Sequence, residues 1–338
     1  MRRVAARCFP SRMVLCAATP LMQRAFQSGG TRGPQGGQQP PEVGSFRGQP
    51  QQPPRQQMEQ EAPPPPTRPP GEPKFFKSDL NQNGVLTLKM SRAPVNSLSL
   101  DMFEEINTWL LWYGYDETVK AIVLTSDIPM VFSAGLDITE LHDPKVERFT
   151  EFWRNFQEIW MILNTFPKPV IAAINGNSPA GGCVLSICCD YRVMARAPAS
   201  APDRLYRIGL NETKLGIVAP PWVMSSYSYI LGTRKAERML QLGETPTADE
   251  ALALGLVDAV VSEEECIATA VKEAEKLLKI PSEARWMSKD MMRRELFRFM
   301  GTDEERQYDT EFFTKMIKTP EVVQSIGNYL SRLGSKKK

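Results

Sequence analysis

The chain has 338 residues, of which 42% are hydrophobic and 24% charged, so it can bury a substantial core in one large domain or two small ones. Its formal net charge of +2 gives no overall signature of nucleic-acid binding. Because His142 is the only histidine, the composition disfavours both a Ser-His-Asp hydrolase and a multi-histidine metal site. The six cysteines have neither zinc-ligand nor disulfide-framework spacing, so we expect reduced thiols.

The N-terminal segment is basic and lacks acidic residues. Residues 1–41 contain six arginines but no aspartate or glutamate, and apolar residues are interspersed among them. This composition is typical of a mitochondrial transit peptide, which we predict over residues 1–28, and it implies a mature protein in the mitochondrial matrix. A secretory signal is the alternative, but its apolar stretch, residues 13–22, is interrupted by Cys16, Thr19 and Pro20.

Residues 29–73 are dominated by proline, glutamine and glycine and contain few branched apolar residues. Such a segment cannot bury enough surface to offset the entropy lost on ordering, so we predict a disordered linker. The proline run at 63–70 also fits a docking motif, although a spacer is the favoured interpretation. No apolar stretch reaches the roughly 18 residues that a membrane span requires, so we expect a soluble mature protein.

Strand and helix signals alternate from residue 74 onward. Short, β-branched apolar runs predict strands at 84–90, 119–125, 169–174, 190–195 and 257–261. Apolar residues at helical spacing predict helices at 99–113 and 144–166. Beyond Ser262 the pattern is almost entirely helical. We therefore predict an α/β core over residues 74–262 and a helical C-terminal region over residues 263–338.

Two glycine-marked turns and one acidic residue are the candidate chemical groups. Phe132–Asp137 follows one predicted strand, and 169–189 is predicted to be a strand, a turn and a helix opened by Gly181 and Gly182. Alone, each turn is better explained by tight packing, and Glu212 by a solvated or capping carboxylate. Together, backbone N–H groups from two turns and a nearby carboxylate suggest enolate chemistry, in which a proton moves next to a carbonyl group.

Five motifs carry a resemblance to a known family: Phe-Ser-Ala-Gly-Leu-Asp-Ile (132–138), Ala-Ile-Asn-Gly (173–176), Pro-Ala-Gly-Gly-Cys (179–183), Cys-Asp-Tyr-Arg (189–192) and the block at 208–217. In this order they closely resemble the crotonase (enoyl-CoA hydratase/isomerase) superfamily, from about residue 74 to the C-terminal helices. The resemblance implies a crotonase (ClpP-like) α/β fold of repeated ββα units, with a helical C-terminal region that assembles trimers or hexamers. Residues 197–205 look like an insertion.

The resemblance also implies roles for individual residues. The backbone N–H groups of Ala134 and Gly181 match the family's oxyanion-hole donors, and Glu212 matches the catalytic carboxylate of its isomerases. Residues implied to contact the acyl-CoA substrate are Arg92, Val95, Asn96, Ser133, Gly135, Leu136, Asp137, Ile138, Gly182 and Lys289. Either Lys289 or Arg293 is expected to meet a phosphate, and an exposed helix face is the alternative for these late basic residues.

The number of carboxylates separates two reactions of this superfamily. Its hydratases use a second glutamate just after the glycines, where this chain has Gly-Cys-Val-Leu at 182–185. Hydration commonly needs two acid/base groups, whereas one base can shift a double bond. Because Pro-Val-Asn-Ser-Leu-Ser (94–99) also resembles the superfamily's Δ3,Δ2-enoyl-CoA isomerases, we expect conversion of 3-enoyl-CoA to trans-2-enoyl-CoA in mitochondrial β-oxidation of unsaturated fatty acids.

We expect no cofactor beyond the coenzyme A of the substrate, no metal and no nucleic-acid partner. Two alternatives remain at this point. One is another crotonase enzyme, such as a hydratase that receives its second acid from elsewhere in the chain. The other is a non-catalytic crotonase-fold protein that binds RNA or a protein partner through the basic, Pro/Gln-rich N-terminal arm.

Overall fold

The computed structural model describes residues 65–335, and residues 66–335 belong to one compact unit. The predicted transit peptide, 1–28, and most of the predicted linker, 29–73, therefore lie outside the described residues. Among the helices of the described part, none combines the length and the apolar character needed to cross a membrane.

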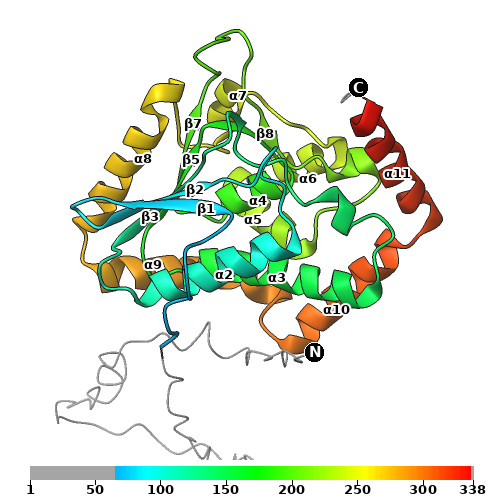
Figure 1. The fold of residues 1–338 in the computed structure, drawn as a ribbon, viewed down its shortest axis with the longest axis horizontal. Coiled ribbons are helices and arrows are strands. Elements are labelled where there is room, and N and C mark those ends of the chain that lie inside the picture. The colour runs from blue at the N-terminus through cyan, green and yellow to red at the C-terminus, as the bar shows by residue number, and fades with distance from the viewer. Residues whose placement is uncertain (1–64, 336–338) are drawn as a thin grey trace, which may run out of the picture. The chain divides into compact units, whose positions relative to one another are not determined.

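A six-stranded sheet forms the centre of this unit (Figure 1). Its strands, in spatial order, are β1 (Phe76–Leu80), β2 (Val85–Met90), β3 (Ala121–Ser126), β5 (Val170–Ile174), β7 (Tyr191–Ala195) and β9 (Ala259–Val261). β1 is antiparallel to β2, and all other neighbours are parallel. Every residue of β3 and β5 is buried, which explains their continuous apolar sequences. The five predicted strands are confirmed to within two residues, whereas β1, which exposes four of its five residues, was not predicted.

A second, three-stranded parallel sheet consists of β4 (Met130–Val131), β6 (Gly176–Pro179) and β8 (Ile208–Gly209). Each of these strands follows a strand of the main sheet and precedes a helix. The three helices are α3 (Val146–Thr165), α4 (Gly181–Ile187) and α5 (Pro221–Leu231). The chain therefore repeats a strand–strand–helix unit three times, as predicted. The short strands were not predicted, because two to four residues carry no measurable periodicity.

The remaining helices surround the two sheets. They are α2 (Leu100–Tyr115), α6 (Thr233–Leu242), α7 (Ala248–Leu254), α8 (Glu263–Leu278), α9 (Ser282–Arg293), α10 (Asp303–Ile317) and α11 (Pro320–Ser335), with 3-10 turns η1 (Ile138–Glu140), η2 (Glu212–Leu215) and η3 (Arg294–Phe299). The predicted helices at 99–113 and 144–166 correspond to α2 and α3, and the predicted helical character beyond Ser262 is confirmed.

The C-terminal helices pack against the main sheet, against α3 and against the η2 turn. α8 packs on β3, β5 and β7, and α9 packs on α3. α10 packs on α3 and on α11, and α11 in turn contacts η2. Figure 1 shows α10 and α11 along one side of the unit, next to α3 and α6. Thr302 and Glu305 form a capping box at the N-terminus of α10, so the helix begins at Asp303.

Candidate active site

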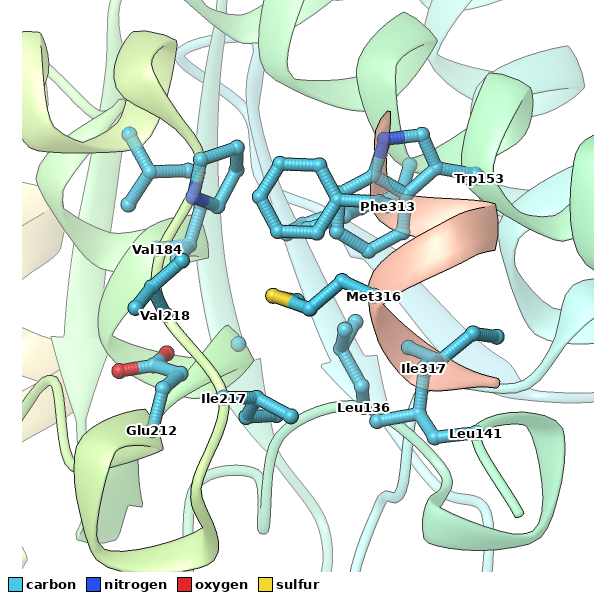
Figure 2. A pocket seen from close by; sticks show the side chains of 14 residues that line it. Leu136, Leu141, Trp153, Val184, Glu212, Ile217, Val218, Phe313, Met316 and Ile317 are labelled. Carbon is cyan, nitrogen blue, oxygen red and sulfur yellow. The ribbon is translucent and has the colours of Figure 1, made fainter. Parts of the chain in front are cut away.

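A small, largely apolar pocket lies between η2, the first turn of α4 and the C-terminal half of α10. Its free volume is about 30 Å³. Glu212 is the one ionisable residue among those that line it, and Leu136 and Gly181 line it as well. Figure 2 shows the Glu212 carboxylate on one side and the α10 side chains Phe313 and Met316 on the other. The pocket thus brings together Glu212 and one residue from each of the two predicted glycine turns.

Glu212 stands at the first position of η2 and is partly buried. The turn ends at Gly216, whose φ of 78° is in the left-handed region that glycine adopts without strain. Within residues 65–335, the Glu212 carboxylate has no ion-pair partner, and its hydrogen-bond partner is its own backbone N–H. Burial raises the pKa of Glu212 to about 7, because the charged form loses hydration in the apolar pocket. Near neutral pH this carboxylate can therefore both accept and return a proton.

The hydrogen bonds of the backbone N–H groups in residues 132–138 determine which of these groups remains free to face the pocket. The N–H of Ala134 donates to the carbonyl of Val95 at 3.0 Å, and Ala134 does not line the pocket, so its predicted role as an oxyanion donor is corrected. The N–H groups of Gly135 and Asp137 are also used, by the Ser133 hydroxyl and a backbone carbonyl. The N–H of Leu136 has no acceptor among the described residues.

The Leu136 nitrogen lies directly beside Gly181. A Cβ atom added to Gly181 would stand 3.0 Å from it, and a Cβ added to Gly135 would stand 2.9 Å from the Gly181 nitrogen. Only glycine at these positions allows the two turns to approach so closely. Because Leu136 and Gly181 both line the pocket, their N–H groups form the donor pair that the structure offers to a substrate oxygen.

Among the described residues the N–H of Gly181 has no backbone acceptor, because α4 begins there. The first N–H groups of a helix have no intrahelical acceptor, and the positive end of the helix dipole adds to their attraction for negative charge. The preceding residue, Ala180, has φ 49° and ψ −123°, a conformation that costs energy for a residue with a Cβ atom. The bond from the Ala180 N–H to the Gly209 carbonyl, 2.8 Å, helps to hold this turn in place.

Asn96 and Ser133 are fully buried beneath the 132–138 turn and hold its shape. The Asn96 amide donates to the Ser126 hydroxyl at 2.8 Å and to the Phe132 carbonyl at 3.1 Å. The Ser133 hydroxyl donates to the Asn96 carbonyl at 2.7 Å. Gly182 is equally constrained, since an added Cβ would stand 2.6 Å from the Ser133 carbonyl oxygen. The side chains of Asn96 and Ser133 therefore support the donor turns, and none of these three predicted substrate-contact residues lines the pocket.

Arg92 and Asp137 form an ion pair at 3.0 Å beside the same turn. Arg92 also donates to the Ser97 carbonyl at 2.8 Å, and Asp137 accepts from the Thr139 N–H at the start of η1, next to Ile138. Burial by itself would raise the pKa of Asp137, but the Thr139 hydrogen bonds and the Arg92 charge together lower it below its ordinary value. The structure therefore places this part-exposed ion pair next to the 132–138 turn.

Lys289 lies elsewhere. Its amine forms an ion pair with Asp190 at 2.9 Å and its side chain is 8% exposed. Arg293, 11% exposed, also binds Asp190, at 3.2 Å, and donates to the Cys188 carbonyl at the end of α4. Neither the predicted phosphate contact nor an exposed helix face agrees with these positions. Burial lowers the pKa of Lys289 to about 8, although Asp190 opposes that change.

The pocket wall contains residues that were not predicted. Phe313, Met316 and Ile317 come from α10, and Trp153 comes from α3. The three α10 residues have i, i+3, i+4 spacing, which is visible in the sequence as the apolar face of a late helix. Nothing in the sequence indicates that this face lies opposite Glu212. Phe156 of α3 also lines the pocket, and the buried Trp222 ring packs against it without lining the pocket itself.

The fold and the pocket define a crotonase-type protein with one carboxylate facing two backbone donors. A profile described as enoyl-CoA hydratase/isomerase matches residues 80–336, and the chain belongs to that family. The chain is 41% identical over 254 residues to enoyl-CoA delta isomerase 1, mitochondrial, of Mus musculus, which covers 75% of this chain and 85% of the relative. For the protein of that name in Homo sapiens the identity is 39%, covering 75% and 82%.

The structure agrees with the sequence relatives. The crystal structure of human mitochondrial delta3-delta2-enoyl-CoA isomerase superposes with a TM-score of 0.74 at 37% identity, covering 78% of this chain and all of the human one. The likeness therefore extends over the part of the chain that contains both sheets, both donor turns and the C-terminal helices.

Proposed function

We propose that this protein is a Δ3,Δ2-enoyl-CoA isomerase that converts 3-enoyl-CoA into trans-2-enoyl-CoA. The observation that carries the proposal is the pairing of one carboxylate, Glu212, whose pKa is near neutrality, with the free N–H groups of Leu136 and Gly181 in one apolar pocket. Relatives that are named enoyl-CoA delta isomerases over three quarters of the chain support the same reaction.

The mechanism requires one base and one oxyanion site. Glu212 removes a proton from C2 of the 3-enoyl thioester, and the electrons move into a dienolate. The N–H groups of Leu136 and Gly181 bind the thioester oxygen as it becomes negative, and they are already oriented before the reaction begins. Protonated Glu212 then returns the proton at C4, which leaves the double bond between C2 and C3. The apolar pocket keeps water away from the dienolate.

Hydration is disfavoured by the residue at the second-carboxylate position. Val184, one turn into α4, lines the pocket where the superfamily's hydratases carry a glutamate. An apolar side chain there can neither hold a water molecule nor activate it. The described lining contains no other acid to take that role.

The setting of the enzyme follows from its relatives. Mitochondrial relatives place the protein in the mitochondrion, and we propose the matrix, where it would serve β-oxidation of unsaturated fatty acids. The reaction moves one proton within the substrate and consumes no reductant, so we propose that coenzyme A of the substrate is the only coenzyme involved. We further propose assembly as trimers or hexamers through the C-terminal helices, on which large apolar side chains such as Met292, 64% exposed, reach the surface.

The proposal is tested with the full chain and two assays. Isomerisation of 3-hexenoyl-CoA is coupled to a downstream enzyme, and hydration of 2-hexenoyl-CoA is followed beside it. We expect isomerisation, little hydration, and a loss of roughly 10²- to 10⁴-fold in kcat for Glu212→Gln, with binding of the acyl-CoA retained. Wild-type turnover in Glu212→Gln would remove this residue from the role of base, and folded protein that is inactive in both assays would contradict the proposed function.

A further inference from the structure

The free space beside Glu212 is far smaller than an acyl chain. Its volume of about 30 Å³ is enough for one or two water molecules. A methylene group is close to a water molecule in size, so even the carbons of a hexenoyl chain beyond the double bond exceed this space. Under the proposed function, some part of the pocket wall must therefore move when substrate enters.

Most of the wall is fixed by other contacts. Gly181 and Glu212 belong to turns that carry the chemistry, and Trp153 and Phe156 are 3% and 2% exposed in the core. The third side of the wall is the C-terminal half of α10, which contributes Phe313, Met316 and Ile317. The rings of Phe313 and Trp153 stack with centroids 4.5 Å apart, so Phe313 is held on α3.

α10 as a whole is anchored by a buried carboxylate one turn before Phe313. Asp309 is 7% exposed, and its Oδ2 accepts hydrogen bonds from Trp153 Nε1 at 2.7 Å, Gln157 Nε2 at 2.9 Å and Trp222 Nε1 at 3.1 Å. If α10 moved away from α3, the buried Asp309 carboxylate and its three hydrogen-bond donors would lose one another as partners. The helix is therefore a fixed support, and on this side of the pocket movement is confined to its side chains.

Met316 is the side chain that has this freedom. Phe313 and Ile317 are each 1% exposed, whereas Met316 is only partly buried and lies one residue from the end of α10. Figure 2 shows its thioether extending from α10 into the pocket, toward the wall that carries Val218 and Glu212. Methionine is unbranched and has three rotatable side-chain bonds, so it can leave this space at little cost.

We propose that Met316 determines the acyl-chain length that the enzyme accepts, an inference that rests on the isomerase function proposed above. Its side chain occupies the space that the carbons beyond C4 require, and it turns outward as the chain enters. Phe313 and Ile317 form the fixed end of the pocket behind it. Each further methylene of the substrate then competes with Met316 for the same apolar surface.

The test compares three variants of the full chain on two substrates. Met316→Ala opens the space, Met316→Phe fills it, and Leu252→Ala, 42% exposed on α7 and outside the pocket lining, is the matched control. The readout is the ratio of kcat/KM for 3-dodecenoyl-CoA to that for 3-hexenoyl-CoA. A methylene that gains an apolar site is worth about fourfold, so space for two methylenes should raise this ratio about tenfold or more in Met316→Ala. Met316→Phe should lower the ratio, and Leu252→Ala should leave it unchanged.

A binding measurement separates this inference from the proposed function. Calorimetry measures the affinities for saturated dodecanoyl-CoA and hexanoyl-CoA without turnover. The ratio of the dodecanoyl-CoA affinity to the hexanoyl-CoA affinity should change in the same direction as the kinetic ratio. If the wild type isomerises both substrates but neither Met316 variant changes the kinetic or the binding ratio, Met316 does not set chain length. If the folded wild type isomerises neither substrate, the proposed function is wrong, and the two affinities still decide whether Met316 limits the pocket.

Discussion

Replacing Glu212 with glutamine should stabilise the protein at alkaline pH while it removes the catalytic base. Burial raises the pKa of this carboxyl from its ordinary value of 4.5 to about 7. The folded state therefore holds the Glu212 proton more tightly than the unfolded state. Stability from this group is complete below pH 4.5, falls as the pH rises toward 7, and stays low above it, because the folded protein must then bury a charge.

The magnitude follows from the two pKa values of Glu212. Raising the pKa from 4.5 to about 7 corresponds to about 3 kcal/mol of unfavourable free energy when the group is ionised. Glutamine has nearly the same shape and no charge, so Glu212→Gln should raise the free energy of unfolding by up to about 3 kcal/mol at pH 8 and by little at pH 4.5. In the wild type, Glu212 is ionised in about one molecule in a hundred at pH 5. The value of kcat/KM at pH 5 should therefore be about 100-fold below its plateau above pH 8.

Urea unfolding at pH 4.5 and pH 8, at one protein concentration, measures the stability difference, and the coupled isomerase assay from pH 5 to pH 9 measures the activity. Glu311→Gln, exposed on α10, is the matched control and should change stability by less than about 0.5 kcal/mol. The reasoning fails if Glu212→Gln gains no stability at pH 8 relative to pH 4.5. It also fails if wild-type kcat/KM is constant between pH 5 and pH 8.

Three further substitutions test other parts of the site. Gly181→Ala places a Cβ atom 3.0 Å from the facing backbone nitrogen, so kcat for 3-hexenoyl-CoA should fall by roughly 10²- to 10³-fold, and near-normal turnover would contradict the donor pair. Val184→Glu adds a second carboxylate to the pocket of Glu212, so the midpoint of the pH–kcat/KM profile should move to higher pH; an unchanged midpoint would show that the two groups do not interact. Asp190→Asn leaves the buried amine of Lys289 without its carboxylate, so the free energy of unfolding at pH 7 should fall by about 3 kcal/mol, measured in urea, and a loss below 1 kcal/mol would argue against a buried pair.

Five of the six strands of the main sheet were predictable because their sequences carry a local strand pattern. β3 and β5 are buried at every position, and a continuous β-branched run is the direct consequence. The family's motifs also located Glu212 and Gly181 in one pocket. By contrast, β4 and β8 are two residues long and exist only because neighbouring strands pair with them, so their sequences carry no period to recognise.

The misassigned donor shows what local sequence cannot provide. Ala134 and Leu136 lie in the same turn, and both have backbone N–H groups. Which one is free depends on the Val95 carbonyl, which accepts from Ala134, and on the close approach of Gly181 to Leu136. Lys289 was misplaced for the same reason: its basic character was evident, but its partner, Asp190, is 99 residues away.

The C-terminal helices are a structural part of the active site. α4 has its N-terminus at Gly181, and the carbonyls at its other end, Cys188 and Cys189, accept hydrogen bonds from Arg293 of α9 at 2.8 and 3.1 Å. α10 supplies the wall opposite Glu212, and α11 contacts the turn that carries it. A cation at the C-terminal end of a short helix also complements its dipole. The oxyanion site, the base and the acyl pocket therefore each depend on residues beyond 262, so the α/β core alone would lack a complete pocket.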